Sequence, residues 1–317
     1  MSKYLITGGA GFIGSNIAEE LVRQGENVRV LDNFSTGLHS NLACVEDNIE
    51  IIDGDLRDPE TLQLAVHGVD YVLHQGALPS VPRSIEAPFT SNAVNVDGTL
   101  NLLIAARHAG VKRLVMASSS SVYGDTPTLP KREDMMLSPL SPYGVSKLAA
   151  EQYCMAFYAS YGFETVALRY FNVFGPRQNP MSQYAAVIPL FIMSAHTGTQ
   201  PTIYGTGEQS RDFTYVDNVV EANILAATKP KAAGKIFNIA AGGTNTLLNV
   251  LALISSLHGE QLIPKHEPQR TGDIMYSYAD ISRAQEILDF KVKIGFEEGL
   301  AKTYSWFKQN CKQQECC

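Results

Sequence analysis

The most informative stretch of this chain is Gly8-Gly9-Ala10-Gly11-Phe12-Ile13-Gly14, which joins an apolar run, Tyr4–Thr7, to a helical pattern. Glycines spaced G-x-x-G-x-x-G permit a tight turn and let backbone N–H groups approach a pyrophosphate at the start of a helix. Asp32 ends the next apolar run, 18 positions after Gly14. A strand before the glycines, a helix after them and an acidic residue at this distance predict a dinucleotide-binding unit rather than an ordinary glycine-rich turn.

Short apolar runs and amphipathic stretches alternate on both sides of this motif and through the first half of the chain. This alternation is typical of βαβ units around a parallel sheet with helices on both faces. The expected fold class is therefore α/β, a Rossmann-type doubly wound parallel sheet. The predicted strands are Tyr4–Thr7, Val28–Asp32, Ile49–Ile52, Tyr71–His74, Leu114–Ser118 and Thr165–Arg169, and the predicted helices are Phe12–Gln24, Asn92–His108 and Tyr143–Tyr161.

Asp32 also indicates which dinucleotide binds. A carboxylate at this position accepts hydrogen bonds from the adenosine ribose, whereas the 2′-phosphate of NADP would meet a negative charge without an adjacent arginine. The sequence therefore predicts NAD as the cofactor. The pair Asp55-Leu56, just after the third predicted strand, is open to two interpretations, a contact to the adenine edge or an ordinary turn.

A second, smaller lobe is expected because proline and glycine become frequent after Arg169 and shorter elements replace the regular alternation. The chain has 317 residues, and single hydrophobic cores stop growing at roughly 250–300. We expect an NAD-binding Rossmann domain over residues 1–175 and a C-terminal α/β substrate lobe over 176–317, with the chain crossing between them. The elements predicted for this lobe are the helices Val216–Thr228, Leu247–Leu257 and Phe296–Lys308 and the strand Ile236–Ile239.

Composition narrows the class of partner. Lys and Arg number 25 against 32 Asp and Glu, and the net charge of −7 provides no basic field for a nucleic acid. No apolar run approaches the roughly 18 residues that span a bilayer, and Met1-Ser2-Lys3 leads into a strand pattern rather than a signal peptide. The five cysteines lack metal-ligand spacing. We therefore expect a cytoplasmic protein with reduced thiols, no metal, and neither nucleic acid nor membrane as a partner.

Tyr143 and Lys147 lie four positions apart at the start of a predicted helix, so both project from one face. A phenol is a poor base at neutral pH, but a neighbouring ammonium and a positively charged nicotinamide would lower the pKa of Tyr143. Ser119 lies 24 positions earlier, where a predicted strand ends and ligands bind in open α/β sheets. Its hydroxyl is suited to orient proton transfer between Tyr143 and a substrate oxygen. Tyr-x-x-x-Lys taken alone is more typical of an ordinary surface helix. A serine-rich loop that satisfies backbone groups is the alternative for Ser119, and the order of the glycine motif, Ser119 and the Tyr143–Lys147 pair favours a functional site.

Together these residues resemble the extended short-chain dehydrogenase/reductase family, from Lys3 to about Phe307. Within that family the nucleotide-sugar epimerases match best, and two segments look especially like the UDP-N-acetylglucosamine 4-epimerases of bacterial surface-polysaccharide pathways. Those two segments are Ser80–Ile85 and Tyr184–Pro189. The other matching segments are Arg169–Pro176, Ser210–Phe213 and Arg270–Asp273.

The resemblance implies Ser119, Tyr143 and Lys147 as the catalytic residues of a UDP-sugar 4-epimerase, which oxidises C4 transiently to a ketone with bound NAD. It implies the cofactor contacts Gly8, Gly11, Phe12, Ile13, Gly14, Asp32, Asn33, Asp55, Leu56, Gln75, Ala77, Tyr143, Lys147 and Tyr170. It implies the substrate contacts Ser80, Ser121, Tyr143, Asn172, Ala186, Val187, Tyr204, Arg211, Arg270, Asp273 and Ser277.

Some of these assignments have a chemical rationale of their own. The guanidinium groups of Arg211 and Arg270 and the amide of Asn172 suit a buried diphosphate. The alternative is that the two arginines lie at the surface in solvated ion pairs. Tyr204 matches the position where the family stacks an aromatic ring on uracil, and is equally compatible with a place in the core.

Two departures from related enzymes narrow the expected reaction. Ser120-Ser121 stand where the family's 4,6-dehydratases carry an Asp-Glu pair, so dehydration is disfavoured. Ser277 is small where family members restricted to UDP-glucose and UDP-galactose carry a tyrosine. This difference favours UDP-GlcNAc and UDP-GalNAc as substrates. The alternative is that Ser277 is a surface serine with no role in the pocket. The alternatives are a UDP-glucuronate 4-epimerase or decarboxylase, for which Arg83 would bind the carboxylate, and a non-catalytic NAD-binding scaffold. A homodimer is expected through the helices at 92–108 and 143–161.

Overall fold

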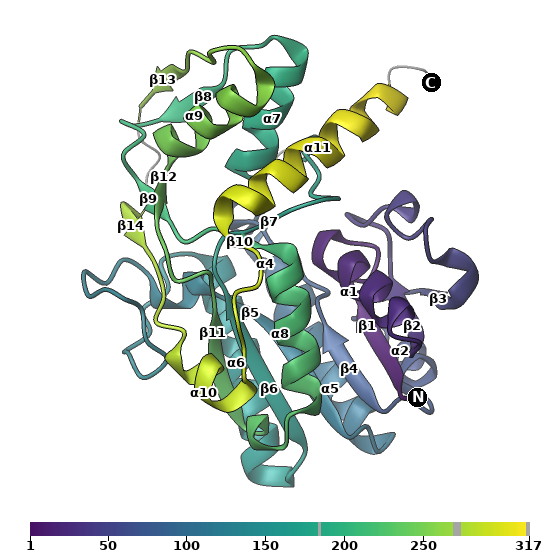
Figure 1. Ribbon diagram of the computed structural model, residues 1–317. Helices are drawn as coiled ribbons and strands as arrows, with labels where there is room; N and C mark the ends of the chain where they lie inside the picture. Colours follow the sequence, from purple (N-terminus) through teal and green to yellow (C-terminus); the bar gives the residue numbers. More distant parts are fainter. Residues whose placement is uncertain (183–184, 269–273, 315–317) are drawn as a thin grey trace.

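The computed structural model describes residues 1–182, 185–268 and 274–314. Its main element is a sheet of seven parallel strands in the order β11-β6-β5-β4-β1-β2-β3, and this doubly wound order confirms the expected Rossmann-type α/β fold (Figure 1). The six predicted strands are all present in it. The strands are β1 Lys3–Thr7, β2 Asn27–Asp32, β3 Ile49–Asp53, β4 Tyr71–His74, β5 Arg113–Ser119, β6 Glu164–Tyr170 and β11 Lys235–Ile239.

Two hydrophobic cores cover the two faces of this sheet, because successive strand side chains point to opposite faces. In β1, Tyr4 and Ile6 belong to one core, whereas Leu5 between them belongs to the other. The first core includes α1 (Phe12–Arg23) and α8 (Val216–Thr228), and the second includes α2 (Pro59–Val66), α5 (Gly98–His108) and α6 (Pro142–Tyr161).

Two elements predicted for the second lobe belong to the Rossmann sheet instead. β11, predicted as Ile236–Ile239, pairs in parallel with β6, and α8 packs on α1 and on strands β4, β5 and β6 (Figure 1). The physical reason is that β6 would otherwise be an edge strand and that one face of its half of the sheet would lack a covering helix. The assignment of these two elements by position along the chain was therefore wrong.

The predicted helix Asn92–His108 is interrupted. A short helix, α4 (Pro88–Asn92), leads through a π-helical turn at Ala93–Asp97 into α5. Gly98 follows this turn, and a Cβ there would lie 2.8 Å from Leu56 Cβ. The close approach of α5 to the segment after β3 therefore depends on glycine. α2 and another short helix, α3 (Val81–Glu86), were not predicted from the sequence.

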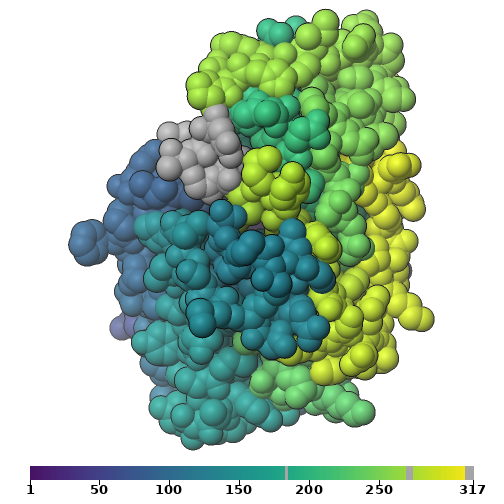
Figure 2. All heavy atoms as spheres, turned by 90° about the vertical axis from the view of Figure 1, so that its left-hand side faces the viewer, coloured from purple at the N-terminus to yellow at the C-terminus, as the bar shows by residue number. Residues whose placement is uncertain are grey.

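The second lobe lies beyond the carboxyl ends of the large sheet, and in Figure 2 its green residues stand above the blue and teal N-terminal half. Three small sheets build it, in the orders β10-β7, β12-β9-β14 and β13-β8. None of the helices in the described part of the chain is long and apolar enough to cross a membrane. The remaining strands are β7 Val173–Phe174, β8 Thr202–Tyr204, β9 Ser210–Arg211, β10 Thr214–Tyr215, β12 Asn245–Thr246, β13 Lys265–Glu267 and β14 Tyr276–Ser277, and the helices are α7 Val187–Thr197, α9 Leu247–His258, α10 Ser282–Leu288 and α11 Phe296–Gln314.

Candidate active site

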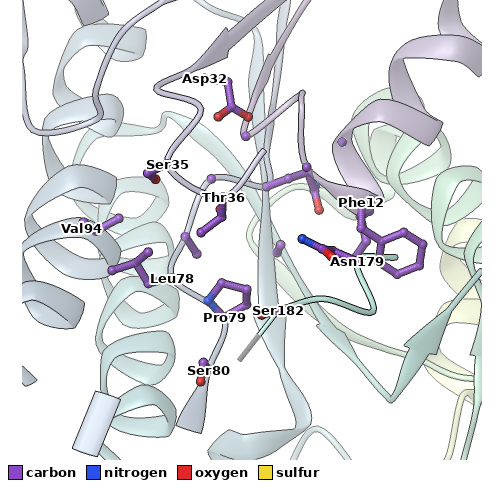
Figure 3. Close-up of a pocket in the computed structure, with 18 of the residues that line it drawn as sticks. Phe12, Asp32, Ser35, Thr36, Leu78, Pro79, Ser80, Val94, Asn179 and Ser182 are labelled. Atoms are coloured by element: carbon purple, nitrogen blue, oxygen red, sulfur yellow. The ribbon is translucent and has the colours of Figure 1, made fainter. Parts of the chain in front are cut away.

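One cavity of about 880 Å³ runs along the carboxyl ends of six strands of the large sheet. In Figure 3, Asp32 lies at one end and Ser80 at the other, with Phe12 and Asn179 on one side and Leu78 and Val94 opposite. Ligands of open α/β sheets bind at this edge. The predicted site residues that line the cavity are Gly8, Gly11, Phe12, Ile13, Gly14, Asp32, Asn33, Asp55, Leu56, Gln75, Ala77, Ser80, Ser119, Ser121, Tyr143, Lys147, Tyr170, Asn172 and Ala186.

The glycine loop leaves room for a diphosphate. Gly8 has a φ of +66°, and a Cβ on Gly14 would lie 2.2 Å from the carbonyl oxygen of Gly8. Helix α1 begins after Gly11, and no side chain caps its first N–H groups. These groups therefore remain available to a ligand, and the residues present fit the diphosphate of a dinucleotide.

Asp32 is held at one end of the cavity by the backbone. Its two carboxylate oxygens accept hydrogen bonds of 2.9 Å from the N–H groups of Ala10 and Phe34. Burial raises the pKa of Asp32, and the two N–H groups act in the opposite direction. Each oxygen keeps a lone pair free, as the predicted contact to the ribose hydroxyls requires.

An arginine of the cavity is linked through Asp55 to Asn33, the residue that follows Asp32. Arg57 lines the cavity and pairs with both oxygens of Asp55, at 2.8 Å from Nε and 2.7 Å from Nη2. Asn33 donates to the same carboxylate at 2.7 Å. The hydrogen bonds from Arg57 hold the pKa of Asp55 well below its usual range. Asp55 is therefore an ion-pair partner, and its predicted contact to adenine remains a prediction.

Ser119, Tyr143 and Lys147 meet near the middle of the sheet edge. Ser141 caps α6 by accepting a hydrogen bond from Gly144 N, which places Tyr143 on the first turn and Lys147 one turn later. Ser119 ends β5, and its hydroxyl lies beside the phenol of Tyr143 and donates to the Ser121 hydroxyl at 3.0 Å. The Lys147 ammonium donates to the carbonyl oxygen of Ala117 at 2.9 Å. The three predicted catalytic side chains are thus held by one strand and one helix.

The protein alone does not favour ionisation of Tyr143. Burial raises the pKa of its phenol, and the hydrogen bond with Ser119 acts the other way. Burial also lowers the pKa of Lys147 to about 8, because it penalises the ammonium. The sequence predicts a lowered pKa for Tyr143, so that expectation depends on positive charge brought by the nicotinamide rather than on Lys147 alone.

Gln75 and Tyr170, both predicted cofactor contacts, share a buried partner that the sequence did not suggest. Asn223 of α8 donates to the Tyr170 hydroxyl at 2.8 Å and accepts from the Gln75 amide at 3.0 Å. No local motif marks Asn223, and α8 was assigned to the other lobe.

Four predicted substrate residues, Val187, Tyr204, Arg211 and Ser277, do not line the cavity, and two others, Arg270 and Asp273, lie outside the described residues. The four are nevertheless in the second lobe. Arg211 and Ser277 stand opposite each other in the register of β9 and β14. Asn172 reaches this region from the cavity, because its amide donates to the carbonyl oxygen of Asp212 at 3.4 Å.

Several polar residues of the cavity were not among the predicted site residues. Arg177 connects the second lobe to the glycine-loop helix, because it lines the cavity and forms an ion pair with Glu19 of α1. Its φ of +69° lies in the left-handed region. Only the proline and glycine punctuation at 175–180 pointed to this turn, and it did not indicate the contact. The other such residues are Ser35, Thr36, Asn41, Arg57, Thr90, Ser118, Ser120, Gln178, Asn179 and Ser182.

Comparison with known proteins shows which family has this fold and this site. Residues 4–240 match the model of the NAD dependent epimerase/dehydratase family. The chain belongs to the NAD-dependent epimerase/dehydratase family. This membership confirms the resemblance and makes NAD the cofactor of the enzyme.

Three similar proteins illustrate the range of the epimerase/dehydratase family. A UDP-N-acetylglucosamine 4-epimerase from Methanobrevibacter ruminantium, solved with UDP-N-acetylmuramic acid, is 41% identical with a TM-score of 0.93, covering 98% of this chain and 99% of that one. The UDP-glucose 4-epimerase of Thermus thermophilus, solved with NAD, is 36% identical with a TM-score of 0.88, covering 96% and 99%. A UDP-N-acetyl-alpha-D-glucosaminuronate decarboxylase of Bacillus cytotoxicus is 36% identical, covering 96% and 97%.

In this epimerase/dehydratase, Asp32→Asn is expected to lower the ratio of the Kd for NADP to the Kd for NAD by about tenfold, or about 1.4 kcal/mol. The change removes the negative charge that a 2′-phosphate would meet and leaves Arg57 nearby. Calorimetric titration of protein freed of its cofactor measures the ratio. Asp53→Asn is the matched control, because Asp53 stands opposite Asp32 in the β2–β3 register but does not line the cavity. An unchanged ratio in Asp32→Asn would contradict this role.

Proposed function

We propose that this enzyme catalyses the reversible C4 epimerisation of a UDP-hexose, with UDP-GlcNAc and UDP-GalNAc as the main pair. The observation that carries the proposal is that Ser119, Tyr143 and Lys147 line one cavity, with the Ser119 hydroxyl beside the Tyr143 phenol. Together with the NAD site, this arrangement suits removal and return of the proton of one secondary hydroxyl. UDP-glucose and UDP-galactose are a second pair that the same chemistry would accept.

In the proposed mechanism, Tyr143 accepts the proton of the C4 hydroxyl and later returns it, and Ser119 orients this transfer. When bound, NAD supplies the hydride acceptor and donor for C4. The UDP group stays anchored while the 4-keto sugar turns about its phosphate linkage, so that Tyr143 meets the opposite face. Lys147, held by Ala117, keeps a positive charge beside the phenolate. Configuration at C4 inverts without net oxidation.

The carboxylates of the cavity support epimerisation over dehydration. The described lining residues include two acidic side chains, Asp32 and Asp55, and both lie at the adenosine end. The residues that follow Ser119 in the cavity are Ser120 and Ser121. Removing water across C5 and C6 needs a further acid and base near the sugar, which these serines do not provide at neutral pH.

The second lobe is proposed to hold the uridine diphosphate. Asn172 lines the cavity and donates to the carbonyl oxygen of Asp212, the residue after β9. Arg211, the last residue of β9, would supply a guanidinium group for a phosphate. We propose that Arg270 is the second cation, that Tyr204 stacks on uracil, and that Ala186 and Val187 offer it backbone groups. Binding energy from this remote group would position the sugar. The remaining proposed contacts are Asp273 to the ribose and Ser80, Ser121 and Ser277 to the sugar.

Ser277→Tyr is expected to lower kcat/KM for UDP-GlcNAc by at least about tenfold, because a bulky side chain would fill the space needed by the acetamido group. Ser277 is 9% exposed, so a larger residue there displaces neighbouring groups rather than extending into solvent. Steady-state kinetics with UDP-GlcNAc measure the effect, and UDP-glucose in the same variant is the internal control. Equal losses on both substrates would remove Ser277 from the sugar pocket.

A uronate substrate is the second candidate, and Arg83 favours it. Arg83 of α3 lines the cavity near Ser80, where a guanidinium group would pair with a sugar carboxylate. Assay of UDP-glucuronate separates the outcomes. Release of CO2 would make the enzyme a decarboxylase, and formation of a C4 epimer without CO2 would make it a uronate epimerase. If neither product forms, the assignment to a UDP-hexose stands.

Two copies are proposed to pair through α5 and α6. Ile104 of α5 and Tyr153 and Tyr161 of α6 are exposed although they are large and apolar or aromatic. Pairing these helices from two subunits would form a four-helix bundle and cover those side chains.

A further inference from the structure

A fully buried ion pair lies between α6 and β6, beneath the catalytic edge of the sheet. Glu151 of α6 contacts Arg169 of β6 through two charge-assisted hydrogen bonds, Oε1 to Nη2 at 2.6 Å and Oε2 to Nε at 2.9 Å. The two side chains are 0% and 1% exposed. Such a pair contributes little net stability, because burying two charges costs about as much as their attraction returns. The ion pair is therefore better explained by the groups that it positions than by stability.

The ion pair is connected to the catalytic strand through Ser118. The Ser118 hydroxyl donates to Glu151 Oε2 at 2.8 Å, and all three groups are buried. Ser118 and Ser119 are adjacent in β5, so their side chains point to opposite faces of the sheet. One serine is therefore fixed to α6 while the next presents its hydroxyl to Tyr143.

Helix α6 holds the end of β5 at two successive residues. Lys147 binds the carbonyl oxygen of Ala117, and Glu151, one turn later on the same face of α6, binds the hydroxyl of Ser118. Tyr143 lies one turn before Lys147 on that face. The position of Ser119 relative to Tyr143 is thus set by contacts between the same two elements.

The far side of the ion pair is also fully partnered. Arg169 Nη1 donates to the Tyr123 hydroxyl at 2.8 Å, and that hydroxyl donates to Asn238 at 2.7 Å. Tyr123 ends the turn Ser120–Tyr123 that follows Ser119 in the chain. The network therefore holds the segment around Ser119 from both sides, and a satisfied network of this kind restricts the geometry of its members.

We propose that Ser118, held by the Glu151–Arg169 ion pair, is a positioning residue that sets the hydroxyl of Ser119 against the phenol of Tyr143. This inference deepens the proposed function and rests on it. Loss of the Ser118 hydroxyl leaves the nicotinamide and nucleotide ends of the site intact and loosens only the proton-transfer geometry.

Ser118→Ala is the test, carried out on the holoenzyme with the UDP-hexose that it epimerises. We expect kcat to fall by about tenfold or more, since a displacement of about 1 Å costs up to about a hundredfold, with KM within about twofold. The limb of the pH profile that reports Tyr143 is expected to move to higher pH, because a misaligned Ser119 stabilises the phenolate less. Ser118→Thr retains the hydroxyl and is expected to retain most of the activity.

A double-mutant cycle with Ser119→Ala distinguishes positioning from a general structural effect. If Ser118 acts through Ser119, Ser118→Ala causes no further loss of kcat in the Ser119→Ala background. Equal losses in both backgrounds, or a Ser118→Thr variant as slow as Ser118→Ala, would overturn the proposal. Thr303→Val is the control for loss of a buried hydroxyl, because Thr303 lies in α11 and bonds only within that helix among the described contacts.

Failure of the inference and failure of the proposed function give different results. If the parent enzyme epimerises no UDP-hexose, the proposed function is wrong and the cycle has no activity to compare. If the parent is active and the losses of the two single variants add, only the role of Ser118 is wrong. NAD content and melting temperature, measured on every variant, show whether each retains the parental structure.

Discussion

Replacing Tyr143 by phenylalanine is expected to lower kcat by about 10²- to 10⁴-fold, the range that a positioned general acid and base contributes. The change removes the phenolic hydroxyl that lies beside Ser119 in the cavity and keeps the ring that packs there. The amount of NAD in the purified protein and the affinity for UDP are expected to stay close to those of the parent. Steady-state kinetics and the absorbance of NAD released on denaturation measure both.

Tyr158→Phe is the matched control for this variant. Tyr158 belongs to the same helix but is 40% exposed and lies outside the lining of the cavity. Its loss of a hydroxyl is expected to leave kcat unchanged. A Tyr143→Phe enzyme that turns over like the Tyr158→Phe enzyme would remove Tyr143 from the chemistry.

Gly14→Ala is expected to abolish retention of NAD and to destabilise the protein by about 1–3 kcal/mol, the usual cost of overpacking. The added Cβ would lie 2.2 Å from Gly8 O and 2.7 Å from Gly9 Cα, and both atoms belong to the backbone. The loop must therefore move, and the N–H groups at the start of α1, which we propose to bind the diphosphate, move with it. NAD content and the midpoint of denaturant unfolding measure the two effects.

Gly295→Ala is the control for the glycine change. A Cβ at Gly295 meets no atom within 4 Å, and its φ is not in the left-handed region. We expect this variant to keep its NAD and its stability. NAD retained by Gly14→Ala at the level of Gly295→Ala would contradict the binding of the diphosphate at this loop.

The six strands of the sheet that were predicted correctly are those that alternate with helices along the first part of the chain. Periodicity detects such local units because each strand and its crossover helix are neighbours in sequence. It does not detect that β11 pairs with β6, because β7 to β10 and the helices α7 and α8 separate the two strands along the chain. For the same reason α8 was predicted as a helix but assigned to the wrong lobe.

In the candidate site too, motifs within one segment were predicted, whereas contacts between residues far apart in the sequence were missed. The glycine loop and the Tyr143–Lys147 pair are motifs with fixed spacing, and the structure brings both to one cavity. Arg57 and Asn223 were missed because their roles depend on partners brought near by folding. The direction of the pKa shift of Tyr143 was also missed, since burial is not visible in a sequence.

The role of Ser118 was also not predicted from the sequence. In sequence Ser118 is one of four consecutive serines, and nothing in that run marks it as the partner of Glu151. The pleat of β5 separates them, because it turns Ser118 toward Glu151 and Ser119 toward Tyr143. Which serine acts in proton transfer and which one positions it is therefore a property of the strand rather than of the motif.

The most direct test of the proposed function is to incubate the purified enzyme with UDP-GlcNAc that carries deuterium at C4 and to analyse the products by NMR. We predict formation of UDP-GalNAc with the deuterium still at C4, because the hydride removed from C4 returns to the same carbon. Replacement of the label by hydrogen from water would contradict this route. Absence of any C4 epimer from UDP-GlcNAc and from UDP-glucose, in enzyme that contains NAD, would contradict the proposed function itself.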